Sequence, residues 1–136
     1  MINGNYEKFR LEIRELLKNA ISFRDLKEEN SYHLFVIGIV SIMSENYFVK
    51  SNVESGDGIP DLVLKPKDKN KKAFIFEFKY SRAKDSKNLK RTAKSALKQI
   101  NDRNYSEGLK YEGYKEIVKI GMGFRKKDVE VVVEEE

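Results

Sequence analysis

Three parts of the chain carry apolar residues at helical spacing. In residues 6–20 charged side chains separate Phe9, Ile13, Leu16, Leu17 and Ala20, which predicts an amphipathic helix. Residues 31–45 are apolar nearly all round and can be capped by Ser31, which predicts a helix covered on more than one side. A third helix is predicted over residues 87–104 from the stripe Leu89, Ala93, Ala96, Leu97 and Ile100.

Between and after these helices the apolar residues alternate with a period of two, which predicts strands. The predicted strands cover residues 47–53, 59–64, 73–80, 117–124 and 129–133. The last one follows a hairpin loop and is expected at a sheet edge. The order is helix, helix, three strands, helix, two strands, which indicates a single α/β domain over residues 1–136 with a mixed sheet flanked by helices.

Three polar residues stand where these strands would otherwise carry apolar side chains. Glu77 and Lys79 alternate with Phe76 and Phe78, so both point to the same face of one strand. Asp61 lies near the start of the preceding strand, and a hairpin would bring it beside Glu77.

Two carboxylates that converge on one site repel each other unless a cation lies between them. Oxygen ligands favour a hard ion, hence Mg²⁺ or Mn²⁺, and Lys79 would supply a fixed positive charge beside a scissile phosphate. The competing interpretation is an ordinary cross-strand ion pair, because Glu-x-Lys on a strand is common. The Pro60-Asp61 pair at hairpin distance, before a basic helix, favours the catalytic interpretation.

Positive charge is concentrated in the middle of the chain. The net charge is +5, yet residues 65–103 hold 14 Lys and Arg against 4 Asp and Glu. This asymmetry favours a polyanionic partner such as nucleic acid, although a solvated lysine-rich surface would have the same composition. The chain has no cysteine, which excludes disulfides and cysteine metal sites and favours a cytoplasmic location. No apolar run is long enough to span a membrane, and no signal peptide is recognisable.

Several short motifs occur together along nearly the whole chain. They are Ser22-Phe23-Arg24-Asp25, Tyr32-His33, Ser51-Asn52-Val53-Glu54-Ser55-Gly56-Asp57-Gly58, Asp61, Glu77-Phe78-Lys79, Ala96-Leu97-Lys98-Gln99-Ile100 and Tyr105. With them the chain resembles the PD-(D/E)XK nucleases, and most closely the nuclease domain at the C-terminus of bacterial AAA-ATPase-like proteins. The resemblance implies a restriction-endonuclease-like αβββαβ core, here with an additional N-terminal helix and C-terminal edge strand.

The resemblance also implies roles for individual residues. Asp61 and Glu77 would be metal ligands, Lys79 the catalytic lysine, and Gln99 a helix residue near the metal. A further carboxylate often completes such a site, with Glu29 or Glu54 as the candidates and Glu28 as a weaker one. The branch usually has an arginine before the aspartate, whereas this chain has Gly58-Ile59-Pro60-Asp61. Because this chain lacks that arginine, the phosphate contact that the arginine would make is in doubt, whereas the predicted metal site is unaffected.

Other polar residues have a functional and a structural interpretation. Lys87, Arg91, Lys94 and Lys98 form a basic stripe that fits a DNA-backbone track or a solvated helix face. His33, the single histidine, fits a structural role better than that of a general base. Tyr105, Tyr111 and Tyr114 fit packing better than base stacking.

The sequence therefore predicts a Mg²⁺- or Mn²⁺-dependent endonuclease, and the resemblance favours DNA over RNA as its substrate. The alternative is a non-catalytic nucleic-acid-binding or protein-interaction domain of an ATPase-linked system. No ATPase motif precedes the domain, so an ATPase module would act from another part of a longer chain or in trans. The predicted edge strand over residues 129–133 offers a surface for a homodimer.

Overall fold

A computed structural model describes residues 6–20, 38, 45–51, 60–81, 88–125 and 128–136. Its strands form one five-stranded sheet in the order β1-β2-β3-β4-β5. Strands β3 and β4 are parallel, and the other neighbouring pairs are antiparallel. The bounds are Tyr47–Ser51 for β1, Leu62–Pro66 for β2, Ala73–Tyr80 for β3, Ile117–Arg125 for β4 and Asp128–Glu135 for β5.

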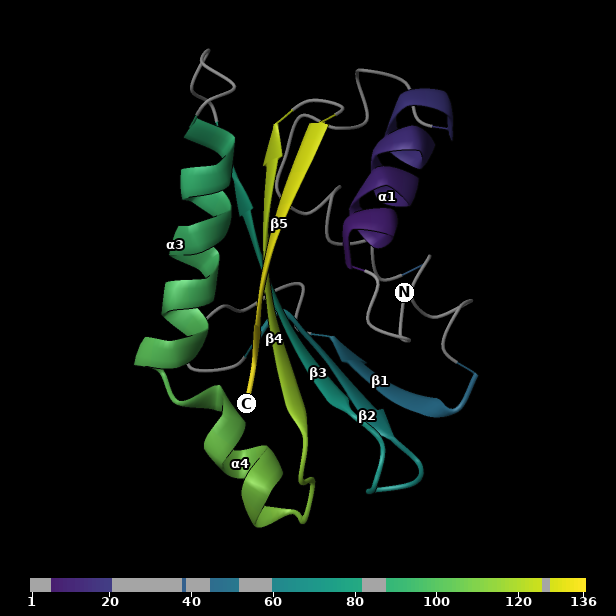
Figure 1. Cartoon of the computed structure of the whole chain (residues 1–136), viewed down its shortest axis with the longest axis vertical. Coiled ribbons are helices and arrows are strands. Elements are labelled where there is room, and N and C mark those ends of the chain that lie inside the picture. Colours follow the sequence, from purple (N-terminus) through teal and green to yellow (C-terminus); the bar gives the residue numbers. More distant parts are fainter. Residues whose placement is uncertain (1–5, 21–37, 39–44, 52–59, 82–87, 126–127) are drawn as a thin grey trace.

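Helices lie on both faces of this sheet (Figure 1). Helix α1 spans Tyr6–Ala20 and packs on one face, whereas α3, Leu89–Asp102, and α4, Tyr105–Tyr111, cover the other. The α/β class, the mixed sheet and the edge position of β5 are confirmed. Of the helix predicted over residues 31–45, only Gly38 and Glu45 fall among the described residues.

Two predictions differ from the structure. Helix α4 was not expected, because seven residues that include Gly108 give too short and too weak an apolar pattern. Strand β2 begins at Leu62 rather than at residue 59. Pro60 has no amide to donate to a ladder, and Asp61 accepts a hydrogen bond through its side chain.

Alternation along the strands gives the sheet two distinct faces. The face under α1 is a continuous apolar core in which Phe74, Phe76 and Phe78 of β3 follow one another. Ring centroids of successive phenylalanines lie 6.5 and 6.1 Å apart, and Phe78 meets Phe124 edge-on at 6.0 Å. On the opposite face Val63, Ala73, Ile75 and Ile117 pack against Ile100 of α3 and Leu109 and Tyr114 around α4. Glu77 and Lys79 belong to this second face.

Helix α3 lies unusually close to β4 because two glycines of that strand face it. A Cβ atom added at Gly121 would lie 2.3 Å from the carbonyl oxygen of Ala93, and one at Gly123 would lie 2.8 Å from that of Leu89. Glycine is the residue that permits such an approach of two backbones. Gly121 pairs with Glu77 and Gly123 with Lys79 across the β3–β4 ladder. The close packing therefore occurs beside the two polar residues of β3.

Charged side chains hold the end of β5 against β4 and α4. The buried Lys119 places its Nζ 2.6 Å from Asn101 Oδ1 and 2.8 Å from a carboxylate oxygen of Glu136. Glu136 also pairs with Lys110. Hydrogen bonds from Lys110 and Lys119 lower the pKa of Glu136 to about 2.

None of the helices in the described part of the chain is long and apolar enough to cross a membrane.

Candidate functional site

The carboxylates of Asp61 and Glu77 each accept a hydrogen bond from a backbone amide at or next to the other residue. The amide of Asp61 donates to Oε2 of Glu77 at 3.4 Å, and the amide of Phe78 donates to Oδ2 of Asp61 at 2.8 Å. The β2–β3 register pairs Leu62 with Phe76, so its continuation by one residue sets Asp61 opposite Glu77. At this end of the hairpin, side-chain carboxylates instead of backbone carbonyls accept the hydrogen bonds of the backbone amides. This explains why the regular strand begins only at Leu62.

Both residues are buried, with 6% of Asp61 and 4% of Glu77 exposed. Burial and the negative charge of Asp61 raise the pKa of Glu77 from 4.5 to about 8, against smaller opposing effects from the Asp61 amide and Lys79. A buried pair of this kind carries one negative charge too many for its surroundings, and a proton or a cation has to compensate it. Carboxyl pKa values raised by burial and by a neighbouring like charge cluster at functional sites, so this pair is a candidate functional site.

Gln99 reaches the pair from helix α3. Its Nε2 donates to Oε1 of Glu77 at 2.8 Å, so Glu77 receives hydrogen bonds from the Gln99 amide on one oxygen and from the Asp61 backbone on the other. Gln99 is half-buried, although its sequence position was equally consistent with an exposed glutamine. The hydrogen bond depends on the close approach of α3 to the sheet.

Lys79 lies two residues after Glu77 on β3, so its side chain leaves the same face of the strand. It is partly buried, and its positive charge is one of the effects that lower the pKa of Glu77. Asp61, Glu77, Lys79 and Gln99 are thus brought together on one face of the sheet. Their chemical roles remain predictions.

A divalent cation fits this donor set. The two carboxylates are buried together in spite of their like charge, and the hydrogen bonds from Gln99 and two backbone amides fix their orientation. Mg²⁺ commonly takes one or two protein carboxylates and completes its shell with water and substrate phosphate. Within the described residues no group of three or more His, Cys, Asp or Glu residues forms a metal site. Glu29, Glu54 and the weaker candidate Glu28 lie outside the described residues, as does His33.

The basic stripe is exposed where it is described. Arg91, Lys94 and Lys98 lie on α3 away from its buried residues, and Lys98 forms an ion pair with Asp102 at 2.6 Å. Lys87 lies outside the described residues. The exposure of this stripe fits a track for a phosphate backbone and equally fits a solvated helix face.

Sequence reasoning missed two residues that position the site and misjudged one tyrosine. Gly121 and Gly123 let α3 approach the sheet beside β3. The sequence could have indicated them, because they alternate with Ile120, Met122 and Phe124 and so lie together on the opposite face of β4. Tyr105 and Tyr114 pack against the core as expected. The packing prediction for Tyr111 was wrong because its side chain is 95% exposed.

A family model covers most of the chain. Residues 27–134 match a family model described as the PD-(D/E)XK nuclease superfamily. No curated protein and no solved structure matches the chain.

Proposed function

Because the chain belongs to the PD-(D/E)XK nuclease superfamily, we propose that it hydrolyses phosphodiester bonds of DNA in the presence of Mg²⁺ or Mn²⁺. One observation carries the proposal. Asp61 and Glu77 are buried side by side, held by Gln99 and by each other's strand, on the face from which Lys79 projects. This combination matches the superfamily motif and has a chemical use in phosphate-ester hydrolysis.

Each residue has a distinct task in this proposal. Asp61 and Glu77 would hold the metal ion, which, when bound, would make water a stronger nucleophile and neutralise charge on the phosphate. Gln99 keeps the Glu77 carboxylate turned toward Asp61 by its hydrogen bond to Oε1. Lys79 presents an ammonium group on the same face and would stabilise negative charge that develops on the phosphate oxygens.

The finer parts of the proposal rest on sequence. A second ion would need a further carboxylate, for which Glu29 and Glu54 are the candidates. The excess of basic residues over residues 65–103, together with the exposed Arg91, Lys94 and Lys98, supports a nucleic-acid substrate. An ATPase partner, in cis or in trans, remains a prediction from the resemblance.

The test combines cleavage with a binding measurement that does not need activity. Supercoiled plasmid and single-stranded DNA are incubated with the protein in Mg²⁺, Mn²⁺ or EDTA, and Mn²⁺ binding is measured by calorimetry. Asp61→Asn is expected to abolish both cleavage and Mn²⁺ binding, because it removes one of the two buried carboxylates. Lys79→Met is expected to retain Mn²⁺ binding and to lose about 10²–10³-fold in cleavage rate.

Lys71→Met is the matched control, since Lys71 is an exposed lysine in the turn between β2 and β3, at the far end of that hairpin from Asp61. It should cleave like the parent. If the parent protein binds neither Mn²⁺ nor DNA, the nuclease proposal is wrong. Binding of both without cleavage under any condition would favour the alternative of a non-catalytic nucleic-acid-binding domain.

A further inference from the structure

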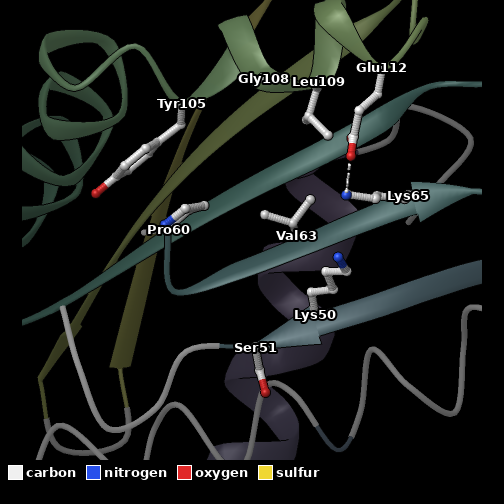
Figure 2. Close-up of a pocket in the computed structure, with 9 residues that line it drawn as sticks. All are labelled: Lys50, Ser51, Pro60, Val63, Lys65, Tyr105, Gly108, Leu109 and Glu112. Carbon is white, nitrogen blue, oxygen red and sulfur yellow. Dashed lines mark hydrogen bonds and ion pairs between the residues drawn. The ribbon is translucent and has the colours of Figure 1, made fainter. Parts of the chain in front are cut away.

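A pocket opens on the catalytic face of the sheet, next to Asp61. It has a volume of about 240 Å³ and lies between β1, β2 and α4 (Figure 2). Pro60 lines the pocket and directly precedes Asp61 in the chain. Val63 lies at the floor of the pocket and follows Asp61 by two residues. Residues two apart on a strand share a face at a separation of about 7 Å. The pocket therefore begins at the side chain next to Asp61, a proposed metal ligand, on the same face of the sheet.

The lining combines an apolar floor with polar groups at one end. Figure 2 shows Pro60 and Tyr105 at one end, Val63 and Leu109 in the middle, and Lys65 with Glu112 at the other end. Lys65 Nζ lies 3.0 Å from the carboxylate of Glu112. A mostly apolar cavity with a few convergent polar groups is the usual form of a small-molecule or base site.

This arrangement suits a nucleobase. The ion pair offers a donor, the ammonium of Lys65, beside an acceptor, the carboxylate of Glu112, and the edge of every base carries groups complementary to one or both. The apolar floor suits the faces of the ring, as in enzymes that take a base out of its stack. Lys50 supplies positive charge for the backbone of that nucleotide, since it pairs with Val63 across the β1–β2 ladder and lines the same pocket.

We infer that this pocket receives an unstacked nucleotide of the substrate strand, next to the phosphate that is cut. The inference rests on the proposed nuclease function and narrows its substrate to a strand that is single-stranded, frayed or opened at the cleavage position. A base within a stacked duplex is not available to a pocket on the protein surface.

Gly108 allows the pocket to be filled without disturbing the fold. It lines the pocket from α4, and a Cβ atom added there meets no other atom within 4 Å. Gly108→Leu would place a branched side chain at the pocket, whereas Gly108→Ala adds a single methyl group and serves as the matched control. Both replacements remove a helical glycine, so both should leave the helix at least as stable as in the parent.

The test measures binding in EDTA, where metal-dependent cleavage cannot occur. Two fluorescent probes are used in anisotropy titrations, a 12-nucleotide oligothymidine and a 12-unit strand of the same charge in which every base is absent. The parent and Gly108→Ala should bind the base-containing strand more tightly. Gly108→Leu should lose about fivefold or more of that preference, which is the lower end of what one bound base contributes, with unchanged affinity for the abasic strand.

Equal affinity of the parent for the two probes, or a preference that Gly108→Leu leaves intact, would overturn the inference, as would an absence of all binding. The proposed function is judged separately, by cleavage of single-stranded DNA in Mn²⁺. If the protein does not cleave but prefers the base-containing strand, and Gly108→Leu loses that preference, the proposal of catalysis is refuted and the proposal of a base pocket is kept. Cleavage by Gly108→Leu at the parent rate on oligothymidine would overturn the pocket and retain catalysis.

Discussion

Replacing Gly121 by alanine would place a methyl group where the backbone of helix α3 already lies. The added Cβ would be 2.3 Å from the carbonyl oxygen of Ala93 and 2.6 Å from the amide nitrogen of Leu97. Both are backbone atoms of one helix, so no side-chain rotation can relieve the contact. To restore ordinary van der Waals separation, α3 has to move away from β4 by about 1 Å.

The cost follows from this displacement. Overpacking of a well-packed interior destabilises proteins by about 1–3 kcal/mol, and for a domain of this size that corresponds to a fall in melting temperature of about 3–10 °C. The same displacement pulls Gln99 away from Glu77, whose hydrogen bond is now 2.8 Å long. A misplacement of about 1 Å near reacting groups can reduce the catalytic rate about 100-fold.

The assay is thermal and urea unfolding followed by circular dichroism, with Gly108→Ala as the control. Both substitutions change glycine to alanine, so their effects on the unfolded chain are alike, yet the Cβ at residue 108 meets nothing within 4 Å. Gly108→Ala should stabilise the protein by roughly 0.5–1 kcal/mol. If Gly121→Ala melts at or above the parent temperature, α3 does not pack closely on β4, and the two glycines do not position Gln99.

Three further predictions concern pH and nucleic-acid binding. Because the pKa of Glu77 is raised in the folded protein, the folded state holds an extra proton between about pH 4.5 and 8, and metal-free protein should lose stability as pH rises through that range. Melting temperatures measured in EDTA from pH 5 to 9 should show this loss, and Glu77→Gln should flatten the dependence on pH. Added Mn²⁺ should raise the melting temperature more at pH 8 than at pH 6. The same pH profile in Glu77→Gln as in the parent would contradict the assignment of the raised pKa to Glu77. Hydrogen bonds from Lys110 and Lys119 lower the pKa of Glu136 to about 2, so these two interactions stabilise the fold above about pH 4.5 and disappear as pH falls toward 2. Glu136→Gln should therefore reduce the acid sensitivity of the melting temperature in that window. Replacing Arg91 and Lys94 together by methionine should weaken DNA binding at low salt and reduce the slope of log affinity against log salt by about one for each DNA phosphate that the two side chains neutralise, and an unchanged slope would identify the stripe as a solvated helix face.

Local patterns were sufficient to predict most of the fold and the candidate site residues. The alternation of Phe74, Phe76 and Phe78 predicted strand β3 with its observed bounds, because successive side chains of a strand point to opposite faces of the sheet. The same alternation identified Glu77 and Lys79 as polar residues on one face. The position of Asp61 beside Glu77 was predicted because a hairpin pairs the start of its first strand with the end of its second.

Only the tertiary structure decided how these residues meet. That Gln99 donates to Glu77, that Gly121 lets α3 approach, and that α4 closes a pocket beside Asp61 all depend on the packing of segments far apart in the chain. A sequence pattern records which face of an element is apolar, which is a property of that element alone. The distance between two elements is set by the side chains of both, and in this protein it is set by the absence of a side chain at two glycines of β4.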